Sequence, residues 1–145
     1  GRARAGSYHA DVCVARILPV GDDAAARGRA ALAQLAILID LYDRGMREPL
    51  PLSSDASAAY AQAAVAGQSG ADAADKAWTS TFDYPKEDRQ PEHVLVYGGE
   101  IPLSDLMATA PRADENWHPD EASRFGVYAR RLWDGLLVRE EIGDR

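Results

Sequence analysis

A proline-spaced run in the first half of the chain restricts the fold more than any other feature. The run Glu48-Pro49-Leu50-Pro51-Leu52 cannot be helical, because each proline drives the preceding residue into extended backbone and lacks an amide hydrogen. Gly45 precedes the run and suits the left-handed position that ends a helix. Ser53, Ser54 and Asp55 follow it and are all good N-cap residues. The sequence therefore predicts two helices joined by an extended connector.

The segment before the connector is typical of an amphipathic helix from Ala24 to about Arg44. Apolar residues recur there at three- and four-residue steps, which places them on one helical face. We expect this face to form a buried stripe made by Leu32, Leu35, Ile39, Tyr42 and Met46. A two-residue alternation from Tyr8 to Leu18 predicts a strand covered on both faces. Strand, turn and helix together indicate one βα unit.

The remainder of the chain predicts mostly short helices. No linker interrupts it, so we expect a single domain over residues 1–145, α/β in class and predominantly helical with few strands. The predicted elements are helices at Ala56–Ala66, Ala71–Ser80 and Pro102–Ala108, loops at Phe82–Pro91 and Pro111–Trp117, a strand at His93–Tyr97, and a last helix from His118 to about Glu141.

Composition limits the classes of function. A hydrophobic content of 46% is enough for a core, and a formal net charge of −7 argues against a surface that binds nucleic acid throughout. Cys13 is the only cysteine, which excludes an internal disulfide. No apolar run approaches membrane-spanning length, so we expect a cytoplasmic location. The chain does not begin with Met, which is expected of a piece of a longer polypeptide and equally of a tag remnant at the N-terminus.

No pattern in the sequence indicates a catalytic site, a metal site or a bound cofactor. The histidines are isolated, Gly98-Gly99 lacks the other residues of a phosphate loop, and there is no G-x-S-x-G nucleophile turn. Restriction-type nucleases place an acid and a lysine two residues apart on a strand. Asp83 and Lys86 lie three apart, with Pro85 between them, so they would face opposite ways. We therefore expect no nuclease site in this segment.

Two small groups of residues are candidates for binding. Arg124, Arg130 and Arg131 would contact DNA phosphates, or would instead form solvated salt bridges with Asp120, Asp134 or Glu121. Trp117 and Trp133 would anchor a protein interface, where tryptophan is enriched, or would pack in the core. The sequence leaves both pairs of alternatives open.

Three blocks of the chain resemble the C-terminal region of the RecC family, the gamma subunit of exodeoxyribonuclease V. The first is LYDRGMREPLPLSSDASAAYAQA, which is similar in its L-Y-x-x-G helix end, its P-L-P-L connector and the aromatic Tyr60. The second, FDYPKEDRQPEHVLVYGG, is similar to actinobacterial members, and the third is YARRLWDGLL in the last helix. These motifs are structural rather than catalytic.

The resemblance carries expectations about function. The family is the non-catalytic partner of the RecB helicase-nuclease and the RecD helicase, in a complex that processes double-strand DNA ends for recombinational repair. Its C-terminal domain is similar to a restriction-endonuclease-like fold that has lost its catalytic residues. The resemblance therefore implies a scaffold segment with RecB, RecD and, within the full complex, DNA as partners. An alternative is a DNA-binding module that uses the arginines of the last helix.

Overall fold

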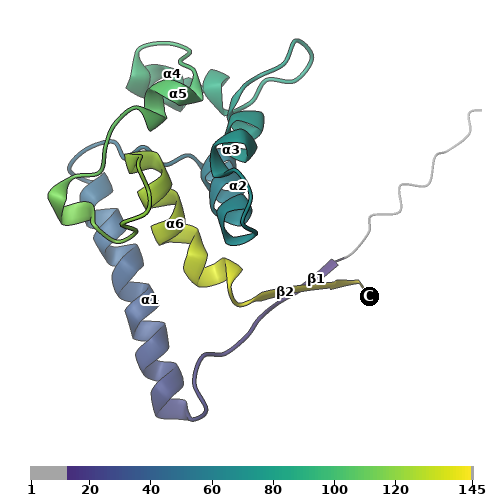
Figure 1. The fold of residues 1–145 in the computed structure, drawn as a ribbon, viewed down its shortest axis with the longest axis vertical. Helices are drawn as coiled ribbons and strands as arrows, with labels where there is room; N and C mark the ends of the chain where they lie inside the picture. The colour runs from purple at the N-terminus through teal and green to yellow at the C-terminus, as the bar shows by residue number, and fades with distance from the viewer. Residues whose placement is uncertain (1–12, 145) are drawn as a thin grey trace, which may run out of the picture.

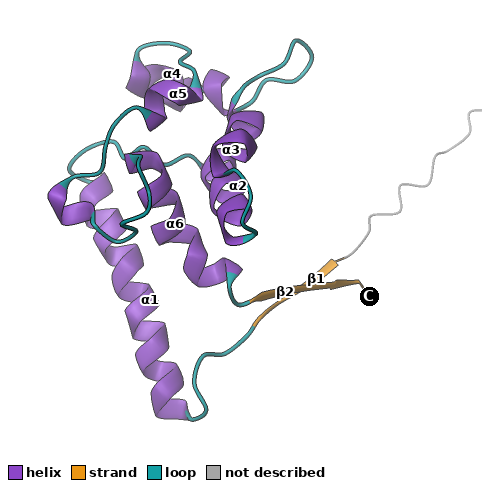
Figure 2. Ribbon diagram, in the orientation of Figure 1, coloured by secondary structure: helices purple, strands orange, loops and turns teal. Residues whose placement is uncertain are grey.

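The computed structural model describes residues 13–144, which form helices around one core (Figure 1). Figure 2 shows that the strands of this part are confined to one short ribbon. The expected predominance of helices with few strands is confirmed for these residues. In chain order the elements are β1 (Cys13–Ile17), α1 (Ala24–Gly45), α2 (Ser54–Val65), α3 (Gly70–Trp78), the 3₁₀ turn η1 (Glu87–Arg89), α4 (Pro91–Tyr97), α5 (Leu103–Met107), the 3₁₀ turn η2 (Ala113–Glu115), α6 (Arg124–Leu137) and β2 (Glu140–Asp144).

The connector is flanked by helices, as predicted, but the start of α2 is capped in an unexpected way. The side chain of Ser53, at the N-cap position, makes no capping hydrogen bond. Instead, the carboxylate of Glu87 accepts hydrogen bonds from the amides of Asp55 and Ala56, each at 2.8 Å. Glu87 is 2% exposed. A buried acid from a segment predicted only as a loop therefore satisfies the free amides of this helix.

The core lies between α2, α3, α5 and α6. Trp78 closes α3, is 1% exposed, and donates a hydrogen bond from its indole Nε1 to the carbonyl of Ile101 at 2.8 Å. Alanines on α2 and α3 allow these helices to approach each other closely, and the large aromatic residues fill the space that is left. The core consists of Ala56, Tyr60, Ala74, Trp78, Leu103, Leu106, Phe125 and Ala129.

One contact between α2 and α6 requires a glycine. A Cβ atom on Gly126 would lie 2.6 Å from Oη of Tyr60 and 2.7 Å from a carboxylate oxygen of Glu121. The Tyr60 hydroxyl donates to that same oxygen at 2.5 Å, and its ring also lies 3.0 Å from the Cβ position of Gly70. The tyrosine is therefore fixed from both sides, and α6 reaches it only where a side chain is absent.

The stripe predicted to be buried on α1 is exposed, and that prediction is wrong. Its five residues are between 50% and 69% exposed, the lowest being Leu35 and the highest Met46. The helix packs toward α6 with the opposite face, on which Leu41 is its only buried residue. The three- and four-residue spacing of apolar residues correctly predicted that α1 has an apolar face. This spacing carries no information about whether another element covers that face.

The predicted strand at His93–Tyr97 is wrong, because these residues lie in α4. Pro91 occupies the first turn of this helix, where its missing amide hydrogen costs nothing. Gly98 ends the helix with a left-handed φ of 76°. Both residues were visible in the sequence as helix boundaries, but the β-branched and aromatic content between them favoured a strand.

The last helix is shorter at both ends than predicted. It begins at Arg124, because the hydroxyl of Ser123 accepts the amide of Gly126 at 3.0 Å and caps the helix there. It ends at Leu137. The residues that follow turn into β2, where the prediction extended the helix to about Glu141.

The ribbon is antiparallel and joins the two ends of the described chain, with Cys13 opposite Asp144 and Ile17 opposite Glu140. The predicted strand is confirmed over residues 13–17, whereas residues 8–12 lie outside the described residues. Among the residues described, β1 has β2 as its one neighbour, and Ile17 is 55% exposed. The expected cover on both faces of this strand is therefore absent from this part of the chain.

We predict that Gly126→Ala destabilises the chain by roughly 1–3 kcal/mol, although alanine is the better helix former, because the added methyl group must displace Tyr60. The matched control is Gly28→Ala in α1, where no atom lies within 4 Å of the new Cβ. That variant should be neutral or gain up to about 1 kcal/mol. Urea unfolding followed by circular dichroism measures both, and a Gly126→Ala chain as stable as the wild type would contradict the close-approach argument.

Candidate functional site

Charged and polar side chains from three separate segments converge where the connector meets the start of α6. We call Glu48, Arg112, Glu115, Arg124 and Tyr128 the Glu115 cluster. Glu48 begins the proline connector, Arg112 and Glu115 flank and end η2, and the other two residues lie on the first turns of α6. The cluster thus joins parts of the chain that are up to 76 residues apart.

Arg124 and Glu115 form a buried ion pair at the centre of the cluster. The Glu115 side chain has no exposed surface, and Arg124 is 6% exposed. The guanidinium group donates to Glu115 through Nε at 2.9 Å and Nη2 at 2.7 Å, and Nη2 also reaches Glu48 at 2.6 Å. Glu115 accepts further hydrogen bonds from the Tyr128 hydroxyl at 2.8 Å and the Arg112 amide at 2.9 Å. Both charges are therefore fully partnered, as burial requires.

These hydrogen bonds keep both acids ionised. Burial by itself would raise the pKa of Glu115, but the hydrogen bonds from Arg124, from the amide of Arg112 and from Tyr128 outweigh it and lower that pKa to about 2. The pKa of Glu48 is also lowered to about 2, first by Arg112 and then by Arg124. Burial raises the pKa of the Tyr128 hydroxyl, as does its hydrogen bond to Glu115.

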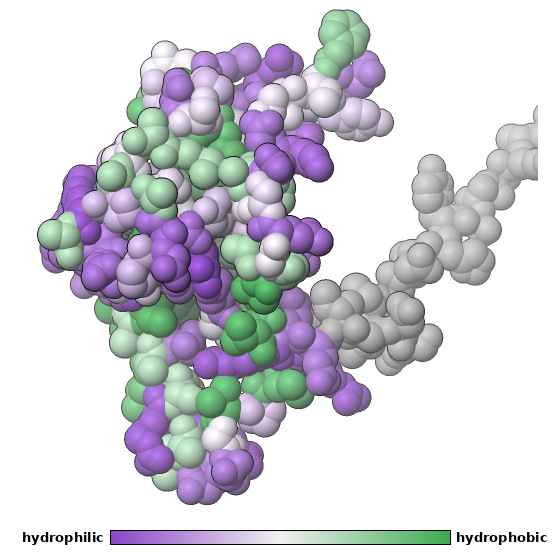
Figure 3. All heavy atoms as spheres, in the orientation of Figure 1, coloured by the Kyte–Doolittle hydropathy of each residue, from purple (hydrophilic) through white to green (hydrophobic). Residues whose placement is uncertain are grey.

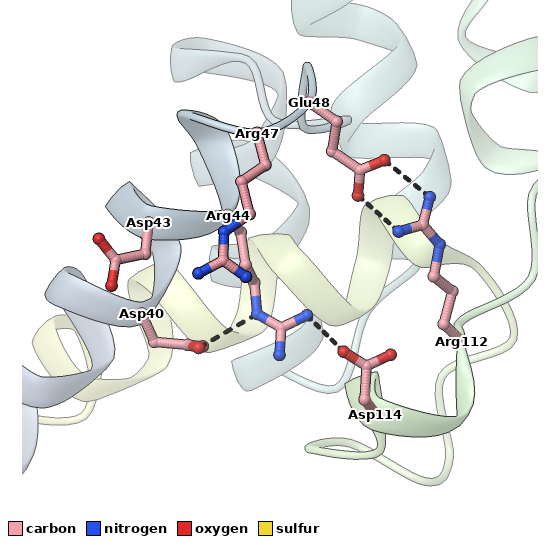
Figure 4. A pocket seen from close by; sticks show the side chains of 7 residues that line it. All are labelled: Asp40, Asp43, Arg44, Arg47, Glu48, Arg112 and Asp114. Atoms are coloured by element: carbon pink, nitrogen blue, oxygen red, sulfur yellow. Dashed lines mark hydrogen bonds and ion pairs between the residues drawn. The ribbon is translucent and has the colours of Figure 1, made fainter.

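An open polar pocket of about 380 Å³ lies beside the cluster (Figure 4). Arg44 bridges Asp40 at 3.1 Å and Asp114 at 2.8 Å, and Arg112 binds both oxygens of Glu48 at 2.6 and 2.7 Å. Four acids and three arginines line the pocket, so its formal charge is −1. The lining residues are Asp40, Asp43, Arg44, Arg47, Glu48, Arg112 and Asp114.

The arrangement is suited to holding segments of the chain together rather than to binding an anion or catalysing a reaction. Arg44, Arg112 and Arg124 each face carboxylates of this same chain, so an anion would have to displace those carboxylates to bind. Glu48 and Glu115 have pKa values far below neutral, which removes them as general acids near pH 7. Among the described residues, no group of three or more potential metal ligands is close enough to bind a metal ion.

The other two candidate arginines of α6 are also paired within the chain. Arg130 contacts Asp134 at 3.0 Å and Glu121 at 3.4 Å, two of the partners that the salt-bridge alternative named. Arg131 contacts Asp40 of α1 at 2.9 Å. Arg124, Arg130 and Arg131 are thus all paired with carboxylates of this chain. Their contact with DNA stays a prediction.

The two candidate tryptophans are partly buried within the chain. The Trp117 ring carries the Arg131 guanidinium over its face, with Cζ 3.7 Å from the ring centre, and packs edge-on against Tyr128. Trp133 donates from Nε1 to the hydroxyl of Ser57 at 2.8 Å, which ties α6 to α2. Their role at a partner interface stays a prediction.

Sequence reasoning missed Glu48, Arg112, Glu115 and Arg44 as members of a site. The segment Pro111–Trp117 was predicted as a loop, and an acid in a polar loop is ordinarily solvated. A weak local signal exists, because Arg112 and Glu115 have the three-residue spacing at which a side chain caps a short helical turn. The pairing with Glu48 and Arg124 depends on the tertiary fold and leaves no trace in local spacing.

The fold and the cluster define a helical structural unit in which the acids and arginines of the Glu115 cluster neutralise one another. In the described residues, no helix is both long and apolar enough to cross a membrane. The family model described as the RecC C-terminal domain matches residues 8–65. No solved structure matches the chain.

Relatives in mycobacteria extend this match beyond the family model. The RecBCD enzyme subunit RecC of Mycobacterium tuberculosis, strain H37Rv, is 40% identical over 109 residues, which cover 75% of this chain and 10% of the relative. The subunit of the same name from Mycolicibacterium smegmatis is 41% identical over 108 residues, covering 73% of this chain and 10% of the relative. The chain belongs to the RecC family, and it spans about a tenth of the length of the curated relatives it matches.

We predict that Arg124→Ala destabilises the chain by roughly 3–5 kcal/mol, because it leaves the buried carboxylate of Glu115 without its charged partner. Arg112→Ala is the matched control, since Arg112 also pairs with Glu48 but its side chain is 54% exposed. Because that pair is exposed to solvent, its loss should cost much less stability than the loss of Arg124. Chemical denaturation compares the two, and equal losses of unfolding free energy would contradict the central place of the buried pair.

We also predict that the chain loses stability in acid in a way that depends on Glu115. Its pKa is about 2 in the folded chain against 4.5 for the free side chain, so folding favours the ionised form. The stabilisation is therefore complete above about pH 5 and is lost as the pH falls toward 2, with an upper size of about 3 kcal/mol. Unfolding midpoints measured from pH 6 to pH 2.5 should fall less steeply for Glu115→Gln than for the wild type. Parallel curves would count against this assignment.

Proposed function

We propose that this chain is a C-terminal segment of a RecC subunit and acts as a non-catalytic scaffold within the RecBCD helicase-nuclease. In that role it would help to assemble the complex that processes double-strand DNA ends in recombinational repair. The residues 1–145 would form one domain, part of a restriction-endonuclease-like fold that lacks catalytic residues. The relatives are named as subunits of the RecBCD enzyme, so RecB and RecD are the partners we propose. Since such a complex acts on chromosomal DNA, we place it in the cytoplasm.

The Glu115 cluster is the observation that carries this proposal. Its arginines are engaged by carboxylates of the same chain, and its two acids have pKa values near 2. Catalytic sites keep groups whose pKa lies near the working pH, whereas structural ion pairs keep groups permanently ionised. The cluster also joins the connector, η2 and α6, which is the arrangement that a rigid scaffold needs.

We predict that the immobilised chain captures RecB or RecD, each purified separately from the same source. Arg112→Ala should capture as much as the wild type, because it keeps the buried pair, whereas Arg124→Ala should capture less in proportion to its loss of folded structure. Incubation of the same preparation with Mg²⁺ and linear duplex DNA should give no cleavage. The measurements are band intensities in the pull-down and product formation on a gel.

Two results would contradict the scaffold proposal. One is failure to capture either subunit while the chain is folded by circular dichroism. The other is Mg²⁺-dependent cleavage that coelutes with the chain through successive columns. Salt-dependent DNA binding that is lost in Arg130→Ala/Arg131→Ala would favour the alternative of a DNA-binding module.

A further inference from the structure

The strongest unexplained feature of the molecule is the apolar outer face of α1. This face is made by Leu32, Leu35, Ile39, Tyr42 and Met46, all between 50% and 69% exposed. Smaller residues continue it toward the start of the helix, since Ala24, Gly28 and Ala31 fall on the same side. A helix of 22 residues is about 33 Å long, so the exposed apolar strip extends along most of that length.

The opposite face of α1 does not anchor the helix along its length. Leu41 is its only buried residue, and the ion pairs of Asp40 and Arg44 with Arg131 and Asp114 lie beside it in the last two turns. Midway along the helix, the Gln34 side chain lies against Gly135 of α6. The first half of α1 extends away from the core without a comparable attachment (Figure 1). Secondary structure of this kind ordinarily depends on burial of an apolar face.

In the described part of the chain, a pocket and the ribbon next to this face also leave apolar surface without a packing partner. An apolar pocket of about 410 Å³ opens between α1 and α6, lined mainly by Ile17, Ile37, Leu38, Leu132, Trp133 and Leu136. Figure 3 shows hydrophobic residues at the surface in the lower part of the molecule, where α1 and this junction lie. Within residues 13–144, the ribbon beside the pocket has two strands, fewer than an independently stable sheet needs. The core described above contains no residue of α1 or of the ribbon.

The composition of the face indicates a permanent cover. Interfaces that form and dissociate have polar residues across much of their area, whereas permanent ones resemble a core cut in half. Between Ala24 and Met46, Asp43 is the one charged residue that borders the strip closely. A face this apolar and this large also exceeds what a soluble monomer ordinarily exposes. The face therefore calls for a cover that stays in place rather than one that binds and dissociates.

We infer that the outer face of α1 is covered by another part of the same RecC-type polypeptide, through an aliphatic helix or strand surface without charges. The inference rests on the proposed function, in which this chain is a segment of a RecC subunit. The matched relatives are about ten times longer than the aligned segment, so they contain ample chain to provide such a surface. A cover that belongs to the same polypeptide is present in every folded molecule, whereas a separate subunit or a second copy is present only when it binds.

The test uses the full-length subunit that contains this segment, purified without RecB and RecD. Leu35→Asp and Ile39→Asp should each make the subunit at least fivefold more sensitive to limited proteolysis, because a charge would be forced into a covered apolar contact. Ala33→Asp is the matched control, since it adds the same charge to the same helix at an exposed position away from the strip. It should leave the proteolysis rate unchanged.

A second measurement does not depend on any variant folding. Hydroxyl-radical labelling of the wild-type subunit should modify Met46 and Tyr42 at least tenfold more slowly in the native protein than in the urea-denatured protein. If the face were free, their exposed fractions of 69% and 66% would give rates within about twofold of the denatured ones.

Other outcomes would overturn the inference and identify a different cover. If the subunit alone tolerates Leu35→Asp and labels freely, but the variant no longer binds RecB or RecD, another subunit covers the face. If the variant only converts a dimer of the subunit into a monomer, a second copy covers it. These results are separate from the pull-down that tests the scaffold role, because stability and labelling are measured without the partners.

Discussion

The burial of Glu115 against Arg124 is the interaction on which the rest of this structure depends. Arg124 stands at the first position of α6, where the positive end of the helix dipole disfavours a cation. Two carboxylates offset that cost, one from η2 and one from the connector. Because the guanidinium group binds both at once, the start of α6 can take only one position relative to the connector. The contacts of Phe125, Gly126 and Ala129 with the core follow from that position.

A second buried acid, Glu87, fixes the start of another helix, α2. Glu87 accepts the first free amides of α2, so the helix that follows the connector is capped from a segment more than 30 residues later in the chain. Glu87 and Glu115 both come from stretches that look like polar surface loops. Glu87 is buried because it satisfies the free amides of α2, and Glu115 is buried because it pairs with the guanidinium group of Arg124 at the start of α6. The connector is thus fixed at both ends from outside, at Glu48 by two arginines and at the start of α2 by Glu87.

The local parts of this fold could be predicted from the sequence, and the long-range parts could not. The two prolines and the polar residues after them located the connector, since turn and cap residues act within a few positions. The left-handed position predicted for Gly45 is wrong, because Gly45 is the last residue of α1 and its φ is not positive. The His93–Tyr97 segment was misassigned because composition favoured a strand, while Pro91 and Gly98 favoured a helix. The partners of Arg124 and Arg131 lie up to 91 residues away, and no local spacing reports such contacts. The RecC resemblance is confirmed because it depends on motifs in three blocks of the sequence, which can be recognised without knowing the contacts between them.

The molecule therefore divides into a half with a complete core and a half that needs more chain. In α2 to α6, aromatic residues and buried acids are satisfied internally. On α1, five large apolar side chains stay at least half exposed, and each forfeits roughly 1 kcal/mol of burial free energy or more. Their sum is comparable to the whole stability of a small domain. Whatever covers α1 must supply a large share of the stability of this region, and the ion pairs at its last turns then set the angle at which the covered helix meets the core.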